Sequence, residues 1–465
     1  MNIEGRRITD DRGQTYELER ELGRGGQGAV YAAKGGKRAI KILFDRSNTR
    51  RDLLRGQLQN IRQMHELRNL AIACPLEMLQ APHLGYVMEL ITGMIPIAQL
   101  INPPRSVDSL AEWYLDGGGL HRRLILLARC AEVLAQLHSK GLVYSDPSPN
   151  NIFVSTDLDA YETRLIDADN LHYESSSSTR SFHTPGYGAP ELVLGKSGVN
   201  TLTDAHAFAV IAFQTLCLVH PLMGDLVLDN EPELEEKALE GSLPWVEDPD
   251  DQSNATLHGF PRDIVLSPKL KKLCQRCFSK GLQEPIKRPG ISQWVEDLYS
   301  AADFTMKCPD CSSTYYANQN RCPWCDYPRP VFVELRIKRW EPLQEAREYK
   351  QYIKGQVGLA CLVVTEHQSL ILTNRTVTGR TGIDSHIPAI ELQIEKTNVR
   401  IRSLNGQCFW LSSFDDEHQV VTEVQDEWKR FSSNDQHRTW LLHFAPINCS
   451  HRLATFRFIS GGQSS

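Results

Sequence analysis

The sequence predicts a multidomain α+β protein, in which a strand-rich lobe is followed by a helix-rich lobe, a cysteine-rich segment and an all-β region. The chain has 465 residues, more than one hydrophobic core usually accommodates. Residues 16–45 alternate apolar and polar positions with glycines between them, as hairpin strands do, whereas helical spacing dominates from Glu191 to about Ala302. From about residue 356, β-branched and aromatic runs are separated by Asn, Gly, Asp and Ser, which is typical of an all-β domain.

The composition is that of an ordinary soluble globular protein, and the cysteine usage leads us to expect a cytoplasmic one. A formal net charge of −6 gives no indication of nucleic acid or an acidic membrane surface as the main partner, and we expect neither. The segment Met1–Asp10 lacks the apolar core of a signal peptide. The longest apolar stretch, Ala205–Val219, is too short for a bilayer and is predicted to be a buried helix. Of twelve cysteines only four form a tight cluster, which indicates reduced thiols rather than a disulfide framework.

A glycine-rich turn is predicted between two strands at residues 23–28, Gly-Arg-Gly-Gly-Gln-Gly. Glycines let backbone N–H groups close over phosphate oxygens without a side chain in the way, although a flexible hairpin turn has the same composition. Shortly afterwards Lys41 stands alone among the apolar residues of a strand at 39–43. A lysine there either snorkels at an edge or pairs with anionic oxygens.

Two later turns carry residues suited to metal and hydroxyl chemistry. Asp146 and Asn151 lie five residues apart, and an aspartate and an asparagine at this spacing can orient a hydroxyl and hold a metal ion. Asp167 adds a carboxylate directly after a strand, and residues 184–191 read Thr-Pro-Gly-Tyr-Gly-Ala-Pro-Glu.

Taken in this order, these segments resemble the protein kinase signature over residues 14–300. The resemblance implies a bilobal kinase fold and Mg²⁺-dependent transfer of the ATP γ-phosphate to Ser or Thr of a protein substrate. Asp146 matches the catalytic base, and Lys41 matches the lysine that pairs the α- and β-phosphates. Asn151 and Asp167 match the Mg²⁺ ligands. The ATP-binding set implied in this way is Gly23, Gly25, Gly26, Gly28, Val30, Lys41, Met88, Glu89 and Ile91.

The resemblance also assigns two structural positions. Asp204 matches a buried aspartate that caps a helix. Arg288 matches an arginine that pairs with Glu191, the glutamate of Ala-Pro-Glu.

The sequence departs from the kinase pattern at several positions. Tyr144-Ser145 replace His-Arg before the base, and Ser148 replaces a lysine, which removes one cation near the γ-phosphate. The metal motif reads Asp-Ala-Asp rather than Asp-Phe-Gly, and its last residue, Asp169, is either a second metal ligand or, as we favour, a helix cap. Glu66 is the best candidate for the helix acid that pairs with Lys41. These departures keep open a pseudokinase that docks a partner.

The same departures, with Arg-Pro-Gly-Ile-Ser-Gln-Trp-Val leading into the cysteines, resemble an atypical bacterial kinase family that carries a zinc ribbon. Its members are similar to the kinases of TerY-type kinase/phosphatase triads. The resemblance implies a von Willebrand-type partner and a cognate phosphatase in stress or phage defence.

The cysteine-rich segment contains two Cys-x-x-Cys knuckles with ten residues between them. Two knuckles in a polar hairpin predict one tetrahedral, closed and therefore structural Zn²⁺ site, against the alternatives of a redox pair or unrelated cysteines. Cys274 and Cys277 have no second knuckle and are predicted to pack within a helix. The predicted ligands are Cys308, Cys311, Cys322 and Cys325.

The C-terminal region has a faint resemblance to a forkhead-associated domain, a β-sandwich that binds phosphothreonine. Gly379-Arg380 and Asn405-Gly406 carry the resemblance, but the Ser-Arg-x-x-His segment of that family is missing near 390–392. A plain sandwich for partner docking is the preferred interpretation, and a phosphopeptide-binding scaffold is the alternative.

We therefore expect a kinase domain at 1–302 with lobes meeting near residue 91, a zinc ribbon at 303–332, a linker at 333–355 and a β-sandwich at 356–465. The hydroxyl-rich tract 175–181 precedes Thr184 and could be phosphorylated. Because Ser145 replaces the arginine that normally receives such a phosphate, we expect the loop to be held without phosphorylation; the alternative is that Arg180 and its neighbours receive the phosphate.

Overall fold

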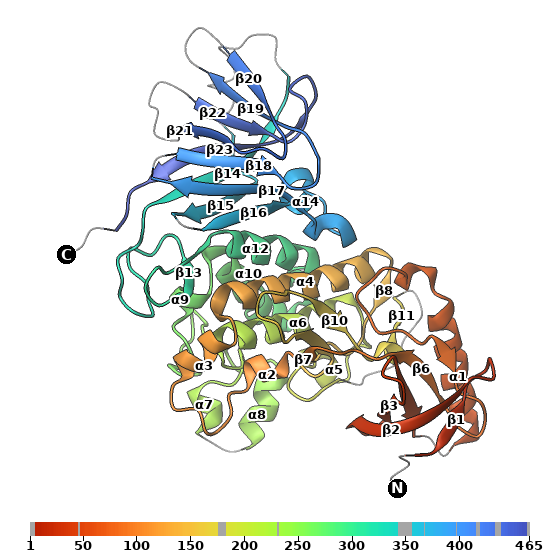
Figure 1. Ribbon diagram of the computed structural model, residues 1–465. Helices are drawn as coiled ribbons and strands as arrows, with labels where there is room; N and C mark the ends of the chain where they lie inside the picture. The colour runs from red at the N-terminus through yellow and green to blue at the C-terminus, as the bar shows by residue number, and fades with distance from the viewer. Residues whose placement is uncertain are drawn as a thin grey trace. The chain divides into compact units, whose positions relative to one another are not determined.

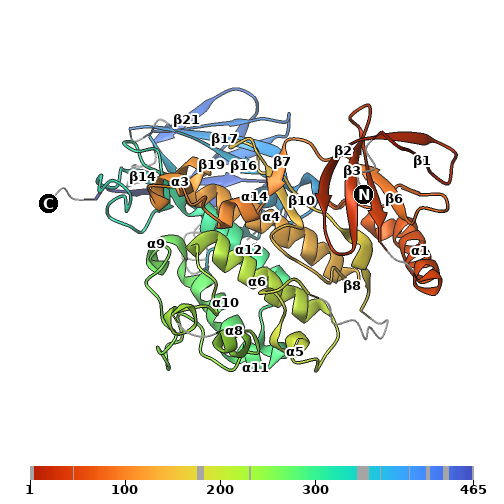
Figure 2. The same ribbon diagram turned by 90° about the horizontal axis from the view of Figure 1, so that it is seen from below.

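The computed structural model describes residues 5–44, 47–174, 183–229, 232–342, 356–366, 368–396, 398–414, 419–432 and 439–462. The chain divides into two compact units (Figures 1 and 2). The first comprises 1–106, 126–259 and 272–295, and the second comprises 107–125, 260–271 and 296–465. None of the helices in the described ranges is long and apolar enough to cross a membrane.

A six-stranded antiparallel sheet begins the first unit, in the order β1-β2-β3-β4-β6-β5 (Figure 1). Its inward apolar side chains form one buried cluster that includes Ile8, Leu18, Ile40 and Val87. Close approach to β4 requires glycine at two positions: a Cβ on Gly28 would lie 2.5 Å from the carbonyl oxygen of Ile42, and a Cβ on Gly85 would clash with that of Lys41. The strands are β1 (Arg7–Thr9), β2 (Thr15–Arg24), β3 (Gly28–Ala33), β4 (Arg38–Leu43), β5 (Glu77–Met78) and β6 (Gly85–Glu89).

Helix α1 (Asn48–Gln63) packs on this sheet through apolar residues spaced along one face. Leu54 and Leu58 join a cluster with Met78, Leu84 and Tyr86 of the sheet region. The helix ends at Gln63 and is followed by the short η1 (His65–Leu67).

The helix-rich part of the first unit is built around α6 (Thr201–Cys217), nearly all of whose residues are buried. This confirms the prediction of a buried helix in the longest apolar stretch. The helix begins with a capping box, in which the Asn200 side chain accepts from the backbone N–H of Leu202 and Thr203 and the Thr203 hydroxyl accepts from the backbone N–H of Asn200.

Short strands and further helices complete the region between residues 94 and 303. Cys274 and Cys277 are buried on α10, as predicted. Sheets form in the order β10-β9-β7 and between β11 and β8. The elements are β7 (Met94–Pro96), α2 (Ala98–Ile101), α3 (Leu110–Asp116), α4 (Gly119–Ser139), β8 (Leu142–Val143), β9 (Ile152–Ser155), β10 (Thr163–Leu165), η2 (Ala168–Asn170), β11 (His172–Tyr173), α5 (Pro190–Val193), α7 (Asp225–Leu228), α8 (Pro232–Leu239), α9 (Arg262–Val265), α10 (Pro268–Phe278), α11 (Lys280–Gln283), η3 (Pro285–Lys287) and α12 (Ile291–Asp303).

The C-terminal region is β-rich, as predicted. Its two sheets have the orders β15-β14-β23-β22-β19-β20 and β16-β17-β18-β21, and their facing side chains share one core that includes Leu335, Leu392, Ile401 and Leu442. The elements are β14 (Phe332–Trp340), β15 (Ala360–Thr365), β16 (Ser369–Thr373), α14 (Asn374–Thr378), η4 (Ile383–His386), β17 (Pro388–Glu395), β18 (Asn398–Ser403), β19 (Phe409–Phe414), β20 (Gln419–Val424), β21 (Lys429–Ser432), β22 (Thr439–His443) and β23 (His451–Ile459).

The predicted linker at 333–355 is wrong over its first part. Strand β14 pairs with both β15 and β23 and so lies inside the six-stranded sheet. Charged residues at 334, 336 and 338 alternate with the core residues Val333, Leu335 and Ile337, and among these three charged residues Arg336 is exposed while Glu334 and Lys338 are buried. This is a period-2 strand pattern with one face on the core. Residues 343–355 lie outside the described ranges.

A small hairpin of β12 (Thr305–Lys307) and β13 (Thr314–Tyr316) precedes the sandwich within the second unit. An aromatic cluster anchors it. Trp324 stacks on Tyr114 at 5.8 Å between ring centroids and meets Phe260 edge-on at 5.4 Å. The guanidinium of Arg123 lies 4.1 Å from the Tyr114 ring centroid, a cation–π contact.

Candidate active site

Lys41 projects from β4 and forms ion pairs with two carboxylates. Its side chain is 8% exposed. In the sheet it is in register with Val30 of β3 and Tyr86 of β6. The ammonium contacts the carboxylate of Asp167 and lies 2.6 Å from Oδ2 of Asp169. Lys41 therefore pairs with anionic oxygens and does not snorkel at the edge of the sheet.

Asp169 is a buried carboxylate whose contacts were not predicted. The Tyr86 hydroxyl donates to its Oδ1, and the Gln57 side-chain amide donates to its backbone oxygen. Burial, followed by the charge of Asp169, raises the pKa of Tyr86 well above its usual value, so this hydroxyl is a donor at neutral pH. The preferred helix-cap interpretation of Asp169 is wrong, because its carboxylate binds Lys41 and Tyr86.

Glu66 is not the partner of Lys41, contrary to the prediction. It lies in η1, beyond the end of α1. Its carboxylate accepts a 3.3 Å hydrogen bond from the Tyr173 hydroxyl, and its backbone oxygen accepts one of 2.6 Å from Lys140. The one acidic residue within α1 is Asp52, which is exposed.

Asp146, the predicted base, lies in the turn after β8 and contacts Thr184. The backbone N–H and the hydroxyl of Thr184 each donate to Oδ1 at 2.9 Å. Burial raises the pKa of Asp146, while the two hydrogen bonds from Thr184 oppose the rise. The side-chain amide of Asn151 donates to the backbone oxygen of Asp146 at 3.1 Å, which leaves the Asn151 side-chain oxygen as its possible metal ligand.

Asp204 holds the Asp146 turn rather than capping its own helix. Its carboxylate accepts backbone N–H bonds from Tyr144 at 2.8 Å and Ser145 at 2.9 Å, and His138 contacts it at 3.0 Å. The Tyr144 hydroxyl in turn donates to the backbone oxygen of Ile166, and the Ser145 hydroxyl donates to that of Asn170. The two residues that replace His-Arg therefore tie the Asp146 turn to the Asp167 turn.

The glycine-rich turn connects β2 and β3, and most of its glycines border open space. A Cβ on Gly23, Gly25 or Gly26 would have no neighbour within 4 Å, so this backbone can approach a ligand. Gly28 differs, because it is needed for the contact with β4.

The predicted adenine-side residues lie on and after β6. Met88 and Ile91 are half-buried, whereas Glu89 is exposed and its carboxylate contacts Arg164 at 2.7 Å. The carboxylate of Asp167 and the amide oxygen of Asn151 are ligands of the kind that Mg²⁺ prefers, so the residues present fit the predicted metal and nucleotide.

The predicted pair of Arg288 and Glu191 is present and buried. Two guanidinium nitrogens of Arg288 each lie 2.6 Å from a carboxylate oxygen of Glu191. The predicted hydroxyl-rich tract at 175–181 lies outside the described residues.

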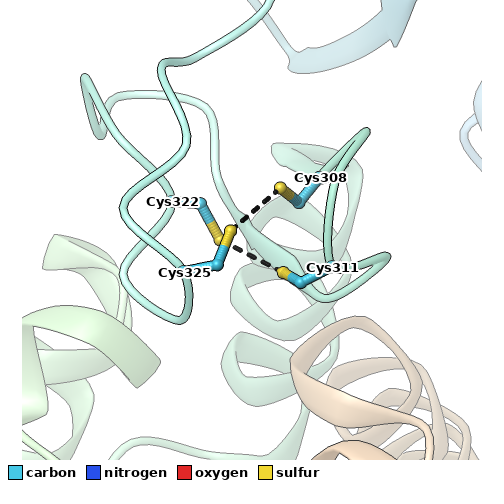
Figure 3. Close-up of side chains that lie close together, drawn as sticks. All are labelled: Cys308, Cys311, Cys322 and Cys325. Carbon is cyan, nitrogen blue, oxygen red and sulfur yellow. Dashed lines mark hydrogen bonds between the residues drawn. The ribbon is translucent and has the colours of Figure 1, made fainter.

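The four predicted zinc ligands converge (Figure 3). Their sulfur atoms lie within 4.8 Å of one another and point toward a common centre. Cys308 and Cys325 are 3.5 Å apart, and Cys311 and Cys322 are 3.7 Å apart, both too long for disulfides. In the part of the chain that the structure describes, it is the one group of three or more Cys, His, Asp or Glu side chains close enough to share a metal ion. Four thiols in a shell of this size fit Zn²⁺.

Comparison with known proteins finds similarity to protein kinases. The model of the protein kinase domain matches residues 16–300. Serine/threonine-protein kinase Pkn1 of Myxococcus xanthus is 27% identical over 216 residues, which cover 43% of this chain and 29% of that protein. The DNA damage-responsive serine/threonine-protein kinase RqkA of Deinococcus radiodurans is 30% identical over 224 residues, covering 45% of this chain and 31% of RqkA. Myosin light chain kinase A of Dictyostelium discoideum is 25% identical, covering 50% of this chain and 75% of that kinase. The chain thus spans less than a third of the two bacterial relatives.

Proposed function

This chain belongs to the protein kinase family, and on that basis we propose that it transfers the γ-phosphate of Mg²⁺-ATP to Ser or Thr residues of a protein substrate. One observation carries the proposal. Lys41 of the N-terminal sheet is joined directly to Asp167, the predicted metal ligand, while Asp204 and the Tyr144 hydroxyl fix the turn that carries Asp146 against the same segment.

Each side chain has a role that follows from its charge. Asp146 would accept the proton of the substrate hydroxyl, and Thr184 would hold its carboxylate in place. Asn151 and Asp167 would hold Mg²⁺, and Lys41 would face the α- and β-phosphates. Bound Mg²⁺-ATP supplies the phosphoryl group and the charge that neutralises its oxygens. Since the transition state is stabilised mainly by fixed charges, the protein's contribution is positioning.

The wider setting is also a proposal. We propose a cytoplasmic signalling kinase in stress or phage defence, with a von Willebrand-type partner and a cognate phosphatase. Its kinase domain would span 1–302, and a zinc ribbon at 303–332 would bind Zn²⁺ through the four clustered cysteines. The convergence of their sulfur atoms within 4.8 Å of one another supports this metal site.

A pseudokinase is the alternative, and Ser148 favours it. This buried residue offers no cation where the kinase pattern has a lysine. The two functions are separated by incubating the protein with Mg²⁺ and ATP labelled in the γ-phosphate, with Asp146→Asn as the matched variant. Label transferred by the wild type and lost in the variant supports the kinase. Nucleotide binding without transfer in either protein supports the pseudokinase.

The C-terminal sandwich has a second candidate function, phosphopeptide docking. Arg380 is exposed in the loop between α14 and η4, and Asn405, whose side chain donates to the backbone oxygen of Pro388, lies after β18. Titration of a phosphothreonine peptide library against the wild type and Arg380→Ala tests this function. Equal weak binding by both proteins would leave partner docking without phosphate as the role of the sandwich.

A further inference from the structure

We propose that Asp169 is the positioning residue for Lys41, in place of an acid on the helix that packs over the sheet. The catalytic consequence of this inference rests on the proposed kinase function. The motif residue that the kinase pattern leaves as glycine is here a carboxylate 2.6 Å from the ammonium of Lys41.

The ion pair between Lys41 and Asp169 matters because both side chains are buried. The side chains of Lys41 and Asp169 are 8% and 6% exposed, so neither charge is well solvated. A buried ammonium needs a carboxylate partner, because an unpaired buried charge is strongly destabilising. Asp167 also contacts Lys41, but a role as a metal ligand would engage its carboxylate. Asp169 is then the partner that remains with Lys41.

Tyr86 binds the other oxygen of the Asp169 carboxylate. It lies on β6 directly across from Lys41 in the sheet register, and its hydroxyl donates to Oδ1 of Asp169. The lysine and the hydroxyl that orients its partner therefore come from neighbouring strands of one sheet. This arrangement pre-organises Lys41 without a contribution from a mobile acidic side chain.

Helix α1 contacts the turn that carries Asp169. Gln57 of α1 donates its side-chain amide to the backbone oxygen of Asp169. An amide suits that contact, whereas a glutamate would bring a carboxylate against a carbonyl oxygen. Helix α1 thus supports the turn that supplies the acid instead of supplying the acid itself.

This arrangement couples two functions in one turn. Asp167 and Asp169 are two residues apart, so one local conformation presents both the predicted metal ligand and the lysine partner. A displacement of this turn would remove both together. A displacement of α1 would act on Lys41 through Gln57 and the turn.

The test is a double-mutant cycle with Asp169→Asn and Lys41→Met in the 465-residue chain. We expect Asp169→Asn to lower kcat/KM for ATP by about tenfold or more, because a charge-assisted contact is lost. In the Lys41→Met background it should cause no further loss, since Asp169 acts through the lysine. Glu66→Gln, the matched control, should stay within about twofold of the wild type. Wild-type activity in Asp169→Asn, or losses that multiply in the double variant, would overturn the inference.

A second, milder variant keeps the test valid if Asp169→Asn does not fold. Tyr86→Phe removes only the hydroxyl that orients Asp169. We expect a smaller fall in kcat/KM than in Asp169→Asn, and the unfolding temperature of each variant is measured to show that it folds. If the wild type transfers no phosphate, the proposed function fails. The inference is then tested by the affinity for ATP, measured by calorimetry. Asp169→Asn should weaken ATP binding when Lys41 is present and should leave it unchanged in the Lys41→Met background. Equal ATP affinity of the wild type and Asp169→Asn would overturn it there.

Discussion

Replacement of Arg288 by methionine should destabilise the first unit strongly. The Arg288 side chain is 0% exposed and that of Glu191 is 11% exposed, and two contacts of 2.6 Å join them. Arg288 also donates to the backbone oxygen of Gly281 at 2.7 Å. Methionine fills similar space but leaves the Glu191 carboxylate buried without its partner. Breaking a buried pair on one side costs about 3–5 kcal/mol.

The effect is measured by urea and thermal unfolding followed by circular dichroism. For a folded region of this size, 3–5 kcal/mol corresponds to a fall in melting temperature of roughly 6–20 °C. Arg276→Met on the exposed face of α10 is the control and should change the free energy of unfolding by less than about 0.5 kcal/mol. Adding Glu191→Leu to Arg288→Met should recover part of the loss, because an apolar pair carries no buried charge. A loss below about 1 kcal/mol in Arg288→Met would refute the reasoning.

Three further outcomes are expected. Asp167→Ala should abolish the Mg²⁺ dependence of ATP binding, because Asn151 alone is a poor magnesium site; equal affinities with and without Mg²⁺ in the wild type would contradict this. Metal analysis should find one Zn²⁺ per chain in the wild type and a large loss in Cys322→Ser, and a wild-type content near zero would count against the site. The raised pKa of Asp146 should place the acid limb of kcat/KM at a higher pH than an ordinary aspartate would, because only the deprotonated carboxylate accepts a proton. Thr184→Val removes a hydrogen bond that lowers this pKa, so the limb should move further up, and a downward move would refute the assignment.

The sequence is informative where a role depends on a residue type at a fixed place in a local motif. The cysteine knuckles and the glycine-rich turn are of this kind, and their residues are where local spacing predicts them. The predicted partner of Lys41 is wrong, because the pair joins a strand to a turn far along the chain. The spacing of residues within one segment does not predict a contact between two distant segments. The aspartate at 169, where the kinase pattern has glycine, is the available signal.

The error at β14 has a different cause. The alternation of Glu334, Arg336 and Lys338 with apolar residues is visible in the sequence, but a highly charged strand between a cysteine-rich segment and a β domain resembles a connection. Glu334 and Lys338 are nevertheless buried: the aliphatic stem of a lysine can pack against apolar surface, and Glu334 accepts two hydrogen bonds from Arg336. Charge content alone therefore does not distinguish a linker from a central strand.

The aromatic cluster around Trp324 has a consequence for the order of events during synthesis. Tyr114 and Phe260 lie within the segment that matches the kinase domain, but they belong to the second unit, which is completed only by residues after 296. In a nascent chain both rings lack their contact with Trp324 until that residue has been translated. Because domains tend to fold as units during translation, this half of the enzyme must wait for its C-terminal partner segments. A chain that stopped before the cysteine knuckles would lack the tryptophan that packs on those two rings.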